Sequence, residues 1–170
     1  MTTGSDIRRA RFVVSYRGTS FRGAAESPGV RTVIGELRVA CEQILGQPIE
    51  FTLAGRTDAG VHALGQVISC DLPGGVDPSD LAHRLSRMCA PDIAVRSGDW
   101  VPDGFNARFS ASSRSYRYHV WNGPVGNPLL HDLTWHVAQS LDLDLMNEAA
   151  QVVVGQHDFS SFCRAPDPAP

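Results

Sequence analysis

Apolar and polar positions alternate along the first part of the chain in a way that predicts four strands and two helices. Runs of β-branched, aromatic and other apolar residues, bounded by Gly, Pro and Asp, are typical of strands. The predicted strands are 11–16, 49–53, 65–72 and 92–100. Between them, apolar residues three and four positions apart predict helices over 32–46 and 77–90.

The predicted helices have clear start and stop signals. Thr32 is a suitable N-cap and Gly46 a suitable residue just beyond the last turn, while Asp77 is followed by Pro78 at the first helical position. The order β-α-β-β-α-β predicts an α+β fold of the ferredoxin-like, split β-α-β type, with an antiparallel sheet and both helices on one face. We expect this domain to span 8–104.

The pattern after residue 104 is that of an incomplete second unit. A polar loop, FNARFSASS, is followed by a predicted strand over 114–122 and a predicted helix from about residue 142 to 155. This β-α order repeats the opening of the first unit. We therefore expect 105–170 to be the start of a second, incomplete β-α unit.

Composition places the chain among soluble globular proteins. Its 170 residues contain no apolar run long enough to span a membrane and no signal-peptide pattern, so the expected location is cytoplasmic, without a membrane. The four cysteines lie far apart without zinc-finger spacing, and Cys41 and Cys70 fall on apolar faces. Reduced core thiols are the favoured interpretation, and no metal site is predicted.

The charged residues exclude some kinds of binding and catalytic site. The formal net charge of −3 argues against a uniformly basic nucleic-acid binder, although arginines gather in the first 65 residues and again over 108–117. All 15 basic residues are arginine, which excludes a Walker A lysine and any lysine nucleophile. Guanidinium groups suit phosphate contacts, but a solvated arginine-rich face explains the same distribution.

The stretch AGRTDAGVHALGQV, residues 54–67, joins two predicted strands and carries the most informative polar residues. An Asp-Ala-Gly turn alone needs only Asp58 and a glycine, because the aspartate bonds its own backbone and glycine accepts positive φ. Arg56, Thr57 and His62 add polar groups beyond that need. A carboxylate kept ionised by the nearby Arg56 fits a nucleophile or general base, and a structural ion pair remains the alternative.

A second candidate cluster lies within residues 108–118, where guanidinium groups alternate with aromatic rings. Arg108 and Arg114 could grip phosphates while Tyr116 stacks a base, and the predicted strand places Tyr116 and Tyr118 on one face. A strand with two core tyrosines and solvated arginines explains the same composition.

Several stretches, taken in order, resemble the TruA-type tRNA pseudouridine synthases. They are Y-x-G-T-x-F-x-G from Tyr16 to Gly23, VRTVIGEL, GRTDAGVHA, FNARFSASSRSYRY and GQHDFSSF. The resemblance implies isomerisation of uridine to pseudouridine in the anticodon arm of tRNA, without cofactor or metal, by a homodimer that binds tRNA. It also implies that Asp58 is the catalytic aspartate, that Arg56 pairs with it and helps to open the RNA, and that Tyr116 packs on the target base.

Two features depart from the family pattern. Family members carry Gly-Trp-Gln-x-Gln where this chain reads Gly23-Ala24-Ala25-Glu26, and the loss of an aromatic ring there predicts weaker or redirected RNA recognition. The family also continues beyond the point reached here, so we expect a shortened chain that lacks the C-terminal part and is stabilised by dimerisation. A C-glycoside isomerase acting on a free nucleotide, or a catalytically inactive RNA-binding or partner subunit, are the alternative functions.

Overall fold

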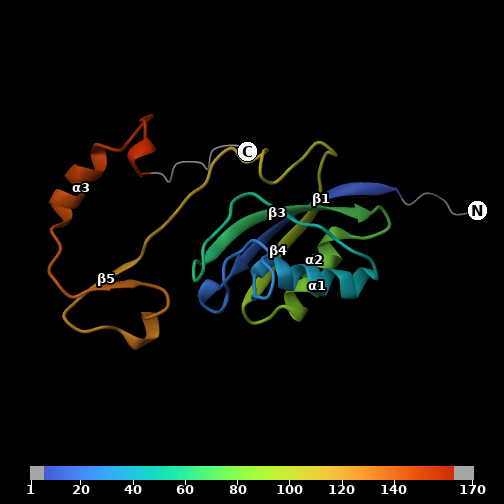
Figure 1. The fold of residues 1–170 in the computed structure, drawn as a ribbon, viewed down its shortest axis with the longest axis horizontal. Coiled ribbons are helices and arrows are strands. Elements are labelled where there is room, and N and C mark those ends of the chain that lie inside the picture. Colours follow the sequence, from blue (N-terminus) through green and yellow to red (C-terminus); the bar gives the residue numbers. More distant parts are fainter. Residues whose placement is uncertain (1–5, 163–170) are drawn as a thin grey trace, which may run out of the picture. The chain divides into compact units, whose positions relative to one another are not determined.

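The computed structural model describes residues 6–162, and the chain divides into two compact units between Tyr116 and Arg117. The first unit has the predicted element order. Its elements are β1 (Ile7–Tyr16), α1 (Val33–Leu45), β2 (Thr52–Leu53), β3 (Ala63–Pro73), α2 (Pro78–Met88) and β4 (Ile93–Trp100), with a 3-10 turn at Gly18–Ser20. The strands form one antiparallel sheet in the order β2-β3-β1-β4, and α1 and α2 lie on one side of it (Figure 1). The α+β class is confirmed.

Both helices of this unit begin at the predicted residues. The Thr32 hydroxyl accepts a hydrogen bond from the Gly35 amide at 3.2 Å, and the Asp77 carboxylate accepts one from Ser79 at 2.9 Å. Gly46 ends α1 with a φ of 70°, a value that glycine adopts without steric cost. The predicted strand over 49–53 is shorter than expected, because only Thr52 and Leu53 pair with β3.

The hydrophobic core lies between the sheet and the two helices. Alternate residues of the central strand β1 are buried on this side, and they end with Tyr16, which is 5% exposed. Cys41, Cys70 and Cys89 are free and buried, as predicted for core thiols, and Cys163 lies outside the described residues. Burial raises the pKa of the Cys41 thiol to about 12 and that of Cys89 to about 11, so both stay protonated at neutral pH.

The opposite face of the sheet is crossed by the segment that follows β4, residues 101–116, which we call the crossing segment. The Val101 amide donates to the Arg9 carbonyl of β1 at 3.0 Å. Further along, the Ala107 amide donates to the Ser69 hydroxyl of β3 at 3.1 Å, and both of these residues are buried. The segment therefore runs from the β4 edge of the sheet towards β2.

The second unit contains short elements only. They are β5 (Val120–Asn122), a 3-10 turn at Pro128–Leu130, β6 (Trp135–Val137), α3 (Leu143–Gln151) and a 3-10 turn at Ser160–Phe162. Asp142, at the start of the predicted helix, caps α3. The helix ends at Gln151, earlier than the predicted residue 155. None of the described residues from 117 to 162 is buried.

The predicted strand over 114–122 is wrong for most of its length. Only Val120–Asn122 is a strand, and its partner is the three-residue β6. Residues 114–118 pair with no strand among the described residues, and His119 only accepts a hydrogen bond from the Trp135 amide of β6 at 2.8 Å. Tyr116 and Tyr118 therefore do not share a strand face as predicted, and both side chains are exposed.

Candidate functional site

The loop of residues 54–62 connects β2 to β3 and presents Asp58 at a tight turn. The Val61 amide donates to the Asp58 carbonyl at 3.2 Å, and Gly60 lies third in the turn with a φ of 81°. Positive φ at this position favours glycine, so the Asp-Ala-Gly turn predicted from the sequence is confirmed. The side chains of Arg56 and Asp58 are exposed on either side of the half-buried Thr57.

The sheet supports this loop through two polar side chains. The phenolic oxygen of Tyr16, at the end of β1, lies 2.8 Å from the Thr57 hydroxyl. Gln66, in β3, donates its side-chain amide to the Gly55 carbonyl at 2.7 Å. The residues flanking the exposed Arg56 are therefore tied to strands of the central sheet.

The segment before α1 supports the loop from a second direction. The Ala24 amide donates to the Thr57 carbonyl at 3.0 Å, and the Gly18 amide donates to Nδ1 of His62 at 3.2 Å. The approach is close, because a Cβ atom built on Gly18 would lie 2.0 Å from the Val61 carbonyl oxygen. Nδ1 of His62, a predicted site residue, therefore accepts a hydrogen bond from the backbone.

The crossing segment contacts the loop from a third direction. Arg114 donates to the Ala54 carbonyl from Nη2 at 2.6 Å and from Nε at 3.2 Å. Tyr116 follows two residues later and is 71% exposed. Arg108 lies earlier in the segment, with its guanidinium over the ring of the exposed Phe109 at 5.3 Å from the centroid. The segment therefore brings an arginine from the second predicted cluster onto the loop that carries Asp58.

The predicted ion pair between Arg56 and Asp58 is not formed. No hydrogen bond or salt bridge joins these two side chains in the described part of the chain. Both are exposed, and an ion pair in water contributes about 0 to 1 kcal/mol, which does not overcome the entropy of ordering a long arginine. The backbone that carries Asp58 is fixed by its turn and by the contacts of Thr57, and not by Arg56.

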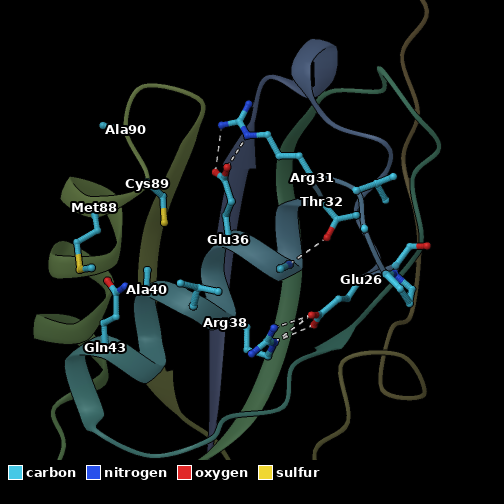
Figure 2. Close-up of a pocket in the computed structure, with 16 residues that line it drawn as sticks. Glu26, Arg31, Thr32, Glu36, Arg38, Ala40, Gln43, Met88, Cys89 and Ala90 are labelled. Atoms are coloured by element: carbon cyan, nitrogen blue, oxygen red, sulfur yellow. Dashed lines mark hydrogen bonds and ion pairs between the residues drawn. The ribbon is translucent and has the colours of Figure 1, made fainter.

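The hollow shown in Figure 2 lies beside α1 and does not include Asp58. It has a volume of about 590 Å³ and is lined by the segment 26–32, by α1 and by the end of α2. Two arginines lie at it, and both are paired with carboxylates: Arg31 with Glu36 and Asp92, and Arg38 with Glu26 and Glu42.

These ion pairs stabilise the segment that supports the loop. Hydrogen bonds and the charge of Arg38 lower the pKa of Glu26, and the same pairing raises the pKa of Arg38. The guanidinium of Arg31 also lies over the ring of Phe21, 4.3 Å from its centroid. Because their guanidinium groups are already paired, these arginines hold α1 to the preceding segment, and the hollow is not an evident anion site.

Comparison with known proteins assigns the family. A family model described as tRNA pseudouridine synthase matches residues 12–110, which include the second half of β1, the loop of residues 54–62 and much of the crossing segment. The chain belongs to the tRNA pseudouridine synthase family. The residues that support the loop, Tyr16, Gly18 and Gln66, also lie within this match.

Individual relatives agree with the family match. The chain is 44% identical over 161 residues to tRNA pseudouridine synthase A of Cutibacterium acnes, covering 93% of this chain and 58% of that protein. It is 46% identical to the protein of the same name from Hyphomonas neptunium, covering 94% and 66%, and 39% identical to that of Brevibacillus brevis, covering 94% and 65%. The chain thus spans about three fifths of the length of the relatives that it matches.

Within this member of the tRNA pseudouridine synthase family, the structure adds two residues that sequence reasoning did not single out as parts of the site. They are Gln66 and the hydroxyl of Tyr16. A signal was available, because each is a polar group in an otherwise apolar strand pattern next to the loop. Among residues 6–162 no cluster of three His, Cys, Asp or Glu side chains could hold a metal ion, and no helix is long and apolar enough to cross a membrane.

Proposed function

We propose that this protein isomerises uridine to pseudouridine in the anticodon arm of tRNA and that Asp58 is the catalytic carboxylate. One observation carries the proposal: within the region that matches the tRNA pseudouridine synthase family, Asp58 is exposed on a loop whose backbone is bonded to three different segments. An exposed carboxylate on a fixed support suits a reaction in which the substrate is a large RNA. The target base of an RNA must leave the base stack before a catalytic side chain can reach it.

The reaction is an isomerisation in which no atom is gained or lost. The C1′–N1 bond breaks with assistance from the Asp58 carboxylate, the detached uracil turns, and C5 bonds to C1′ while the proton on C5 is removed and N1 becomes protonated. The proposed chemistry requires neither a cofactor nor a metal. A carboxylate is a suitable assisting group because it is ionised at neutral pH and can act as nucleophile or base.

The RNA contacts are assigned to the predicted cluster residues around the loop. Arg56 and Arg108 are exposed cations suited to phosphate, and Thr57 lies next to Asp58. Tyr116 is proposed to stack on the target base, because it lies two residues, about 7 Å at most, from the Arg114 anchor on Ala54. Arg114 bonds Ala54 through Nε and Nη2, and we assign its Nη1 to an RNA phosphate.

His62 completes the proposed substrate-binding set, because it is the last residue of the loop that carries Asp58. Its Nδ1 accepts from the Gly18 amide, which requires that a neutral ring carry its hydrogen on Nε2.

The finer details of fold and assembly are part of the same proposal. The strand order β2-β3-β1-β4 supports a ferredoxin-like first domain. The incomplete second β-α unit, expected over 105–170, is proposed to start after the crossing segment, at Arg117. We propose a homodimer in the cytoplasm. Three apolar side chains of α3, Leu143, Leu145 and Met146, are exposed, and exposed apolar side chains that lie close together favour contact between two protein chains.

Product analysis tests the proposed activity. Incubation with a tRNA transcript should yield pseudouridine, detected by mass spectrometry of the digested RNA, whereas UMP should remain unchanged. Conversion of UMP but not tRNA would instead favour a nucleotide isomerase. Steeply salt-dependent tRNA binding without any product would favour an inactive RNA-binding subunit.

Substitution at Asp58 tests the assigned residue. Asp58→Asn should abolish pseudouridine formation while the thermal unfolding midpoint stays within a few degrees, because the side chain is exposed. Asp103→Asn is the matched control, since it removes an exposed aspartate of the crossing segment that is not assigned to the site. Activity retained in Asp58→Asn would refute the assignment. Light scattering at micromolar concentration tests the dimer, and a strictly monomeric mass would refute that part.

A further inference from the structure

Three polar side chains form a continuous hydrogen-bonded row beneath the loop that carries Asp58. Gln66 lies opposite Val14 in the pairing of β3 with β1, on the side of the sheet that faces the core. Its side-chain nitrogen is 2.7 Å from the Gly55 carbonyl and 3.4 Å from the Tyr16 hydroxyl. Tyr16 in turn lies 2.8 Å from the Thr57 hydroxyl.

The direction of these hydrogen bonds follows from the groups themselves. A carbonyl only accepts, so the group that Gln66 directs towards Gly55 must be its amide nitrogen, which carries two hydrogens. The second hydrogen points to the phenolic oxygen of Tyr16. That oxygen accepts from Gln66 and still carries a hydrogen that it can donate to Thr57. With Tyr16 as the donor, the hydrogen of the Thr57 hydroxyl is not used by this row.

The backbone that follows the Thr57 side chain is also fixed. Its carbonyl accepts from Ala24, and the neighbouring Asp58 carbonyl accepts from Val61. When Tyr16 donates in this pair, the Thr57 hydroxyl keeps its own hydrogen for a further acceptor. Asp58 is the next residue of the loop, and its side chain is exposed.

We propose that Tyr16 and Gln66 are positioning residues that hold Thr57 as a hydrogen-bond donor to an oxygen of the target uridine beside Asp58. This inference rests on the proposed function, because it concerns the same reaction. Tyr16 is 5% exposed and does not offer its hydroxyl to a macromolecule directly. Its effect on the reaction passes through Thr57, so its loss changes the placement of groups around the reacting nucleotide and leaves the distant RNA contacts intact.

Kinetics with tRNA test the proposal. Tyr16→Phe removes one hydroxyl and keeps the ring, and we expect kcat to fall about tenfold with little change in KM. Thr57→Val should have the same effect, because valine has the shape of threonine without the hydroxyl, and Thr57→Ser should restore most of the rate. The double variant should be no slower than Thr57→Val, since both substitutions remove the same interaction.

Ser15→Ala is the matched control. The Ser15 hydroxyl donates to the Leu64 carbonyl at 2.8 Å, so this variant also removes one hydrogen-bonded hydroxyl from the end of β1, at the adjacent position, which faces the other side of the sheet. Its kcat should stay within about twofold of the parent. Gln66→Leu is the second test of the row, because it should lower kcat without affecting the RNA affinity.

Amide hydrogen exchange provides a readout that does not depend on catalysis. The Ala24 and Val61 amides are bonded to the loop, and both should exchange faster in Tyr16→Phe but not in Ser15→Ala. If the parent makes no pseudouridine and this difference is still seen, the proposed function fails while the support of the loop by Tyr16 stands. Unchanged exchange with unchanged kcat in Tyr16→Phe, or a change confined to KM, would overturn the inference.

Discussion

Gly18→Ala should loosen the loop that carries Asp58. The added methyl group would lie 2.0 Å from the Val61 carbonyl oxygen and 2.5 Å from its carbon, whereas ordinary contacts begin at 3.4 Å. Both groups belong to backbone, so the two segments must separate by more than 1 Å. That separation breaks the bond from the Gly18 amide to His62 and strains the bond between Ala24 and Thr57.

The expected cost follows from these contacts. One lost and one weakened hydrogen bond cost about 1 to 2 kcal/mol together, and overpacking adds about 1 to 3 kcal/mol, which gives a destabilisation of about 2 to 5 kcal/mol. Displacement of Asp58 by about 1 Å should also lower kcat by about a hundredfold. Urea denaturation gives the first quantity, and pseudouridine formation on tRNA gives the second.

Gly65→Ala is the control for this substitution. Gly65 lies in β3, close to the same loop, and a Cβ atom there would meet nothing within 4 Å. Its stability and rate should therefore stay close to those of the parent. If Gly18→Ala were as stable and as active as Gly65→Ala, the close approach of the two segments would not be what holds the loop.

Three further predictions concern the core and its ion pairs. Leu37→Ala, at a fully buried position, should lower the free energy of unfolding by about 2 to 5 kcal/mol in urea titrations, and a loss below about 1 kcal/mol would contradict the described core. Cys41 and Cys89, whose thiol pKa values are raised to about 12 and 11, should react with iodoacetamide at pH 8 far more slowly in the folded protein than in urea, as mapped by mass spectrometry. Arg38 lowers the pKa of Glu26 below its usual 4.5, so this pair stabilises the fold above that pH and the contribution is lost as the pH falls through the lowered value. Glu26→Gln should therefore show a smaller loss of stability between pH 6 and pH 3, and an acid dependence identical to the parent would contradict the pairing.

The parts of the fold that the sequence predicts well are those decided by local chemistry. Thr32 and Gly46 bound α1 because a cap and a positive φ depend on one or two residues and their own backbone. The strand predicted over 114–122 fails for the opposite reason. A strand needs a neighbour, and a run of tyrosines and arginines shows only that its residues tolerate extended backbone.

The site shows the same division. The turn at Asp58 follows from Asp and Gly alone, and it is confirmed. The ion pair with Arg56 was inferred from proximity in sequence, which does not measure the small free energy that two exposed charges gain in water. The contact of Arg114 with Ala54 was beyond sequence reasoning, because 60 residues separate the two and only the path of the crossing segment brings them together.

The crossing segment determines how far the first folding unit extends. Ala107 is buried against Ser69 on the face of the sheet opposite the helices, and Arg114 is bonded to the end of β2. A protein shortened to residue 104 would keep every helix and strand of this unit, yet it would leave one side of its sheet bare and its Asp58 loop without one of three supports. The smallest piece that folds and holds the loop in place should therefore reach Tyr116, and protease digestion should spare the chain up to that point.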